Sequence, residues 1–265
     1  MSFLRSLFLA LSMFSKIPAP RVDWKSENMR YIMCFFPFVG FFIGGIDFLL
    51  CLLAKSGTLQ NLTGFEIPLA LTIVPVFLTG GIHLDGFMDT SDALASHASR
   101  ERKLEILKDS RVGAFAVINV AVYFLAYFVI SSHFTTLVKE SEISTEVSLC
   151  LVSIFPVSRF LSALAVATFQ CAKGSGLAKT FQDSSAKKFT RIWCVIFLLA
   201  IYSLIIARAH FFGILILASS LLCFAYYFLM SKKHFGGITG DLAGYFVQIT
   251  ELFCLAVLTI AFSFA

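Results

Sequence analysis

Long apolar runs separated by short charged segments constrain this chain more than any other feature of its sequence. A helix needs roughly 20 residues to cross about 30 Å of hydrocarbon, and several runs reach or approach that length. Hydrophobic residues make up 58% of the 265 residues and charged residues only 14%, which is not the composition of a soluble globular domain. The alternating segments of a membrane barrel are not seen. The sequence therefore predicts an all-α fold, a polytopic transmembrane helical bundle.

Seven membrane spans and one flanking helix are predicted. The second span is short and contains Pro68 and Pro75, so we expect it to be kinked or to extend into the acidic segment that follows. Ahead of the first span, apolar residues recur at helical spacing over residues 3–14, which favours an amphipathic helix on the membrane surface over a cleaved signal. The spans, ended by charges or by Gly and Pro, cover residues 31–54, 66–78, 113–132, 147–169, 192–207, 211–230 and 243–265.

Basic residues predict the orientation of the bundle. They gather before the first span and after the second, fourth and sixth, whereas the other loops carry only Lys55, Lys139 and Arg208. Because Lys and Arg mark cytoplasmic loops, we expect the N-terminus to lie inside the cell and the C-terminus outside. The net charge of +5 then reflects topology, and no nucleic-acid partner is expected. The whole chain, residues 1–265, is interpreted as one membrane domain of undetermined oligomeric state.

The seven cysteines are scattered and form no C-x-x-C pair. They are interpreted as small apolar packing residues rather than zinc ligands or disulfides.

An acidic segment follows the second apolar run directly. Asp85, Asp89 and Asp92 have the i, i+4, i+7 spacing that puts three carboxylates on one face of a helix. Three like charges on one stripe repel, so a bound hard cation such as Mg²⁺ is a natural compensation. The alternative is a solvated acidic face paired with the basic residues that follow. Carboxylates at a membrane are more often functional, which favours the metal site.

Two further segments extend this interpretation. Asp109 lies between Lys108 and Arg111, a combination suited to a metal with a phosphate, although these cations also suit the cytoplasmic end of the third span. A Gly-rich turn before the seventh span carries Asp241, which is either a metal ligand or a helix N-cap.

Other candidates are less specific. Lys173 and Lys179 flank a Gly-Ser-Gly loop that offers amides and cations to a phosphate, but it is not a Walker A sequence and an ordinary flexible loop is as good an interpretation. Arg159 and Glu251 would be costly against lipid, so we expect them to pair with each other or to contact substrate. His83, beside the acidic motif, is a candidate phosphate contact.

Taken in order, these motifs resemble the cobalamin synthase family, the adenosylcobinamide-GDP ribazoletransferases. The resemblance rests on Thr-Gly-Gly-Ile-His-Leu-Asp-Gly-Phe-Met-Asp-Thr-Ser-Asp from Thr79, on residues 100–113, and on Gly-Gly-Ile-Thr-Gly-Asp from Gly236. Residues 14–18 and 37–40 add to it, so it covers nearly the whole chain. Departures from the family pattern are Ala93 and Ala116, where Gly is common, and Gln248, where a carboxylate is frequent, whereas Glu251 keeps the next acidic position.

The resemblance implies a transferase of cobalamin biosynthesis that joins adenosylcobinamide-GDP to α-ribazole or its 5′-phosphate and releases GMP. It also implies a bacterial cytoplasmic (inner) membrane protein that uses Mg²⁺ in an active site facing the cytoplasm. Asp92 is the predicted general base. The predicted metal ligands are Asp85, Asp89, Asp92, Asp109 and Asp241, and the predicted substrate contacts are His83, Lys108, Arg111, Arg159, Lys173, Lys179 and Glu251.

Three alternatives remain. UbiA-like prenyltransferases and CDP-alcohol phosphotransferases also bind a metal–diphosphate at a membrane, and a transporter would use the charges for coupling. A single dense acidic stripe counts against the UbiA-like alternative. Charges gathered on one side, and the lack of a repeat, count against transport.

Overall fold

The computed structural model describes residues 2–56, 64–142 and 144–265, and this part of the chain forms helices without a strand. Six of its helices are long and apolar enough to cross a membrane. The prediction of an all-α, polytopic bundle is therefore confirmed. The six are α3 (Ile32–Ser56), α7 (Ala114–Glu140), α8 (Ser144–Thr168), α10 (Lys187–Ala209), α11 (Phe211–Phe235) and α12 (Gly240–Phe262).

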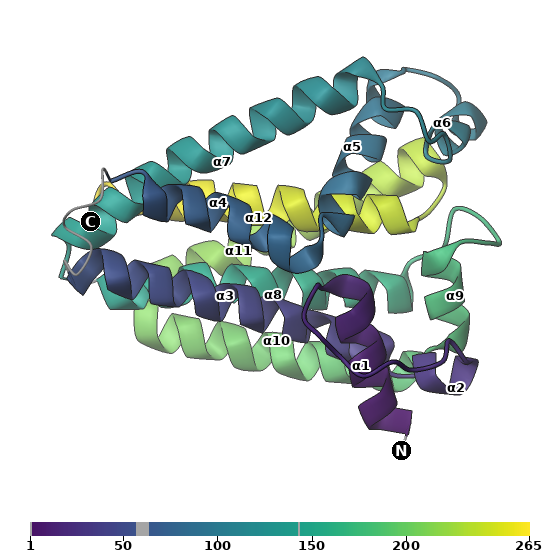
Figure 1. Ribbon diagram of the computed structural model, residues 1–265, viewed down its shortest axis with the longest axis horizontal. Coiled ribbons are helices and arrows are strands. Elements are labelled where there is room, and N and C mark those ends of the chain that lie inside the picture. Colours follow the sequence, from purple (N-terminus) through teal and green to yellow (C-terminus); the bar gives the residue numbers. More distant parts are fainter. Residues whose placement is uncertain (1, 57–63, 143) are drawn as a thin grey trace.

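The second predicted span, residues 66–78, ends at a sharp bend. Helix α4 (Glu66–Thr79) rises only about 21 Å, and α5 (Ile82–Ala95) follows it at a bend of 95°. Gly80 and Gly81 make the bend with φ of 64° and 79°, left-handed values that a β-carbon disfavours. Pro75 stays inside α4, so the turn lies at the glycine pair and not at a proline. Helix α5 thus runs across the direction of the long helices rather than along it (Figure 1).

Helix α8 is the central helix of the bundle. Of its apolar window 83% is buried, compared with 22% for α7 and 28% for α10, whose remaining apolar side chains face outward as lipid requires. Helix α3 packs along α8 through Gly40 and Gly44, which lie one turn apart. A β-carbon on Gly40 would come within 2.6 Å of the Phe155 carbonyl oxygen. Small residues at this spacing allow membrane helices to approach closely.

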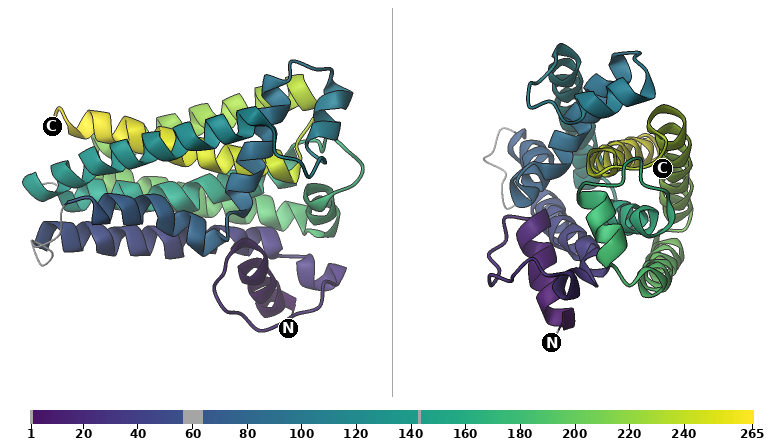
Figure 2. Two further views of the ribbon diagram at one scale, coloured as in Figure 1. Left: turned by 45° about the horizontal axis from the view of Figure 1, so that its top comes forward. Right: turned by 90° about the vertical axis from the view of Figure 1, so that its right-hand side faces the viewer.

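Short helices gather with α5 at one end of the bundle (Figures 1 and 2). Helix α1 there buries Leu9 and Ala10 and exposes Phe3 and Leu4, as predicted for an amphipathic helix. The Lys16 amide donates to the Leu78 carbonyl (2.7 Å), so the end of α1 is tied to the end of α4. The short helices are α1 (Ser2–Phe14), α2 (Ser26–Met29), α6 (Arg100–Ile106) and α9 (Leu177–Ser184).

The chain alternates in direction through the bundle. The connections α4–α7, α8–α10 and α11–α12 therefore share the end that holds α5, whereas the C-terminus lies at the opposite end (Figure 1). These are the three connections that carry the motifs singled out in the sequence. One end of the molecule is consequently where a site can form.

Candidate functional site

A close crossing of α5 and α12 brings together carboxylates that are far apart in the sequence. Asp85 comes from the first turn of α5, and Asp241 from the first turn of α12. A β-carbon on Gly86 would lie 2.6 Å from the Asp241 carbonyl oxygen, and Gly244 of α12 touches the α5 backbone at His83 in the same way. Glycine at both positions permits this approach. The glycine-rich motifs thus place the two acids beside one another.

The carboxylates of Asp85, Asp89 and Asp92 on α5, the acidic stripe, repel one another as their spacing predicts. Burial, together with the neighbouring carboxylates of Asp85, Asp241 and Asp92, raises the pKa of Asp89 to about 6. Each of these contributions disfavours the charged form of Asp89. A cation placed between α5 and α12 would relieve this repulsion.

Asp241 does not serve as the N-cap of α12. The cap is Thr239, whose hydroxyl accepts from the Leu242 amide (3.2 Å). The same hydroxyl donates to Oδ2 of Asp241 (3.3 Å) and steadies its carboxylate. Because Thr239 satisfies the helix end, Asp241 is free to line the cavities on either side of it.

Among the described residues, Asp92, unlike Asp85 and Asp89, accepts hydrogen bonds from backbone amides of another helix. Its Oδ2 accepts from the Gly113 amide (2.6 Å) and its Oδ1 from the Ala116 amide (2.8 Å), at the start of α7. The first amides of a helix lack partners within it, and Asp92 satisfies two of them from another helix. Alanine supplies that amide as glycine would, so Ala116 keeps the bond. Both oxygens of Asp92 are engaged, which contrasts with its predicted roles as metal ligand and general base.

Backbone pairing builds a second part of the site. The Ile238 amide donates to the Gln170 carbonyl (2.9 Å), and the Ala172 amide donates to the Ile238 carbonyl (2.9 Å). These two bonds hold the Gly-Ser-Gly loop after α8 against the Gly-rich turn before α12. A cavity of about 220 Å³ lies between them.

Three predicted phosphate contacts, Lys108, Lys173 and Lys179, line this cavity. The Lys173 ammonium donates to the Leu104 carbonyl (2.5 Å), whereas Lys179 forms an ion pair with Asp183 (2.7 Å). Burial lowers the pKa of Lys173, and the neighbouring Lys108 ammonium lowers it further. An anion bound in this cavity would offset the repulsion between the cations.

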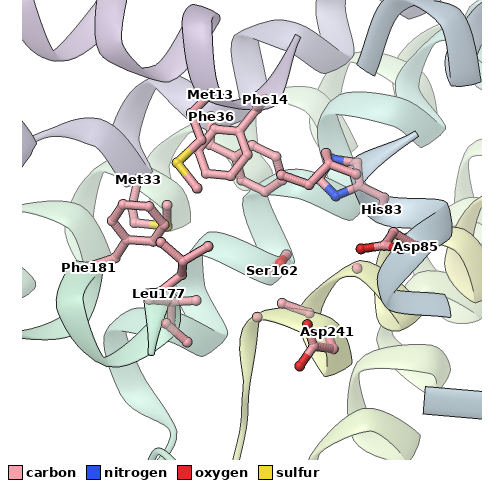
Figure 3. Close-up of a pocket in the computed structure, with 16 residues that line it drawn as sticks. Met13, Phe14, Met33, Phe36, His83, Asp85, Ser162, Leu177, Phe181 and Asp241 are labelled. Carbon is pink, nitrogen blue, oxygen red and sulfur yellow. The ribbon is translucent and has the colours of Figure 1, made fainter. Parts of the chain in front are cut away.

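A larger cavity of about 310 Å³ lies on the other side of Asp241 (Figure 3). His83 and Asp85 of α5 line one side of it, and its remaining wall is mostly aromatic or aliphatic. Nε2 of His83 is buried and has no hydrogen-bond partner among the described residues. Leu177, Ala178, Gly240 and Asp241 line both cavities, so the two adjoin.

Two predicted site residues are engaged with each other at the surface. Asp109 pairs with Arg111 (Nη2 to Oδ2, 2.8 Å), and their side chains are 37% and 86% exposed. Hydrogen bonds from Arg111 lower the pKa of Asp109 to about 2. Neither lines the two cavities. The structure thus separates both from the acids on α5 and α12.

Arg159 and Glu251 form a buried ion pair between α8 and α12 (2.5 Å), one of the two arrangements expected of them. The Ser158 hydroxyl also donates to Glu251 (3.0 Å). Neither charged residue lines the two cavities beside Asp241, but Ser162, one turn along α8, lines the larger one. The sequence did not reveal Ser162 or the aromatic wall, because Phe and Met within apolar helices look the same whether they face lipid or a cavity.

The donor set suits a magnesium ion that also binds phosphate. Among the described residues no three His, Cys, Asp or Glu side chains stand ready to hold a metal on their own. Mg²⁺ is usually held by one or two carboxylates and by substrate phosphates rather than by an all-protein cage. Asp85 and Asp241, next to a lysine-lined cavity, match that pattern.

Comparison with known proteins is informative over nearly the whole chain. A family model described as cobalamin-5-phosphate synthase matches residues 6–259. A relative from Lachnoclostridium phytofermentans is 42% identical over 95% of this chain and 92% of its own length, and one from Clostridium perfringens is 36% identical over 94% and 95%. A third, from Fusobacterium nucleatum, is 31% identical over 94% and 95%. All three are named adenosylcobinamide-GDP ribazoletransferase. No solved structure matches the chain.

Proposed function

Because the chain belongs to the cobalamin-5-phosphate synthase family, we propose that it acts as an adenosylcobinamide-GDP ribazoletransferase, as its relatives are named. It joins adenosylcobinamide-GDP to α-ribazole or its 5′-phosphate and releases GMP. One observation carries this proposal for the site: Asp241 lies between a lysine-lined cavity and a mostly apolar cavity, and Asp85 lines the apolar one. A diphosphate donor and a nucleoside acceptor need those two environments side by side.

The donor diphosphate is assigned to the cavity lined by Lys108, Lys173 and Lys179, where ammonium groups neutralise its charge. Asp85 and Asp241 would hold Mg²⁺, with Asp89 completing the acidic surface behind them. The ion would offset the charge that develops on the departing GMP. Asp92 keeps α5 in place through α7, so it acts as a positioning residue.

In the proposed reaction, the 3′-hydroxyl oxygen of the ribazole ribose attacks the phosphorus attached to cobinamide. A new P–O bond forms as the P–O bond to GMP breaks. The hydroxyl proton passes to His83, whose buried Nε2 has no partner among the described residues and which borders the acceptor cavity. His83 therefore replaces Asp92 as our candidate for the general base.

The identity of the base can be tested with two variants. We expect His83→Gln to lower kcat by about 10²-fold, since a positioned base contributes about 10² to 10⁴. Asp92→Ser, which keeps an acceptor near the start of α7, is expected to retain most of kcat and the wild-type pH profile. Stopped assays of GMP release across pH give both quantities. A changed pH profile in Asp92→Ser with none in His83→Gln would return the role to Asp92.

The lysine cavity predicts a separable binding effect. Replacing Lys173 by Met removes one phosphate contact, so the KM for adenosylcobinamide-GDP is expected to rise about tenfold while that for α-ribazole stays constant. Lys233→Met, at an exposed position on α11, is the matched control. An equal rise in both KM values would show that Lys173 does not bind the donor selectively.

We propose further that the site faces the cytoplasm, on the strength of the basic loops at this end of the bundle. A cysteine introduced at Ser175, in the loop between α8 and α9, is expected to resist a membrane-impermeant maleimide in intact cells and to react in inverted vesicles. The seven native cysteines, six of them buried, are first replaced. Labelling in intact cells would reverse the orientation.

The decisive test of function uses the purified protein in nanodiscs with adenosylcobinamide-GDP, α-ribazole 5′-phosphate and Mg²⁺. We expect equal amounts of GMP and adenosylcobalamin 5′-phosphate by mass spectrometry, and neither after EDTA. Full activity in EDTA would show that the reaction does not need Mg²⁺. If a well-folded sample leaves both substrates intact, the protein is not an adenosylcobinamide-GDP ribazoletransferase.

A further inference from the structure

The cavity of about 310 Å³ beside Asp241 has two unlike sides (Figure 3). Met33, Phe36, Leu177 and Phe181 lie toward one side, whereas His83 and Asp85 lie toward the other. Phe36 also packs edge-on against the His83 ring, with centroids 5.4 Å apart. Such a division suits a ligand with a flat apolar part and a polar part.

Of the ring systems in the proposed substrates, only one matches this cavity in size and polarity. The corrin macrocycle with its adenosyl group is far too large for about 310 Å³. Guanine carries an amide, an exocyclic amine and further ring nitrogens, and a wall of Phe, Met and Leu would leave these groups unpaired at a cost. The dimethylbenzimidazole base of α-ribazole is flat and methylated, and it has a single ring nitrogen that accepts a hydrogen bond.

The wall offers what that base requires. Aromatic rings pack well edge-to-face or offset against one another, and methionine sulfur also contacts aromatic rings favourably. The Ser162 hydroxyl, which faces the cavity between its two sides, can donate to the one ring nitrogen (Figure 3). The sugar of a ligand seated in this way reaches toward His83 and Asp85, where the acceptor hydroxyl is needed.

We propose that this cavity is the acceptor subsite, which binds the benzimidazole base of α-ribazole among Met33, Phe36 and Phe181 and directs its ribose toward His83 and Asp85. This inference rests on the proposed function. It also gives helix α1 a role, since Met13 and Phe14 of this helix line the cavity. The amphipathic helix is thus part of the substrate site as well as a surface anchor.

The test uses two substitutions that each place a larger side chain in the cavity, one from α1 and one from α8. Met13→Trp adds bulk from α1, and Val166→Phe adds bulk from α8; both residues line this cavity and not the lysine cavity. Leu11→Trp is the matched control, because Leu11 is a half-buried residue of α1 that does not line the cavity. Size-exclusion profiles and unfolding temperatures of the variants establish that they are folded.

Binding of radiolabelled α-ribazole to the protein in nanodiscs is measured by equilibrium dialysis, and KM values for both substrates by GMP release. Both filling variants are expected to raise the Kd or KM for α-ribazole by about tenfold or more, because the added side chain occupies space that the base needs. The KM for adenosylcobinamide-GDP is expected to stay constant, and Leu11→Trp to match wild type in both.

An unchanged α-ribazole affinity in the folded filling variants would overturn the assignment, as would a selective loss of adenosylcobinamide-GDP affinity. Failure of the proposed function has a different signature. In that case wild-type protein forms no GMP from the two substrates, whatever the dialysis result. A further variant, Phe181→Ala, enlarges the cavity and is expected to improve binding of the bulkier naphthimidazole riboside relative to α-ribazole.

Discussion

Replacing Asp85 or Asp241 by Asn is expected to lower kcat for GMP release by about 10³-fold or more while leaving insertion and folding intact. The change keeps the size of each side chain and removes one negative charge from the crossing of α5 and α12. If these carboxylates hold Mg²⁺ against the diphosphate, the lost electrostatic stabilisation amounts to several kcal/mol, and about 4 kcal/mol corresponds to 10³ in rate. Rates are measured in nanodiscs over a range of Mg²⁺ concentrations.

Asp23→Asn is the matched control for these variants, since it removes an exposed carboxylate that forms an ion pair with Lys25 at the surface. Asp109→Asn distinguishes the predicted metal set from the observed one. Asp109 pairs with Arg111 outside both cavities, so its loss is expected to change kcat less than about threefold, as for a surface ion pair. If Asp109→Asn lowers kcat as much as Asp85→Asn does, Asp109 belongs to the metal site after all.

The second large effect concerns stability. Arg159→Met is expected to destabilise the fold by about 3–5 kcal/mol, because it leaves the Glu251 carboxylate buried with the Ser158 hydroxyl as its remaining hydrogen-bond partner. Both side chains of the pair are at most 1% exposed, so water cannot substitute for the missing partner. Thermal or denaturant unfolding in a fixed detergent, followed by helical circular dichroism, measures the change.

A double variant separates the cost of an orphaned charge from the worth of the pair. Arg159→Met combined with Glu251→Leu removes both charges, so it is expected to be more stable than Arg159→Met alone. The same destabilisation in the single and double variants would show that lost packing, and not the unpaired carboxylate, dominates. Because the pair lies outside both cavities, the folded fraction of the double variant is expected to keep its KM values.

The local motifs were identified in the sequence because their physical signals are local. A run of apolar residues must form a helix in lipid, and this requirement alone predicted the spans and the amphipathic α1. The spacing of Asp85, Asp89 and Asp92 predicted a shared helical face, and all three lie on α5. The motifs that resemble the cobalamin synthase family cover the same segments that the family model matches.

The roles of individual acids did not follow from sequence, because each depends on a partner brought in by packing. Asp92 looks like its stripe neighbours until α7 places two amides against it. Asp241 looks like an N-cap until Thr239 takes that role. Asp109 stands among cations, and its pairing with Arg111 at the surface depends on how the loop between α6 and α7 turns.

The sequence by itself determined that this chain is a helical membrane bundle, that its acids and lysines gather in the segments between the spans, and which family it resembles. Only the tertiary structure decided which of those side chains meet. The physical reason is that hydropathy and spacing act within one helix, whereas the site is made at the Gly86–Gly244 crossing and at the pairing of Ile238 with the loop after α8. Contacts between distant segments follow from how whole helices pack, which no single stretch of residues encodes.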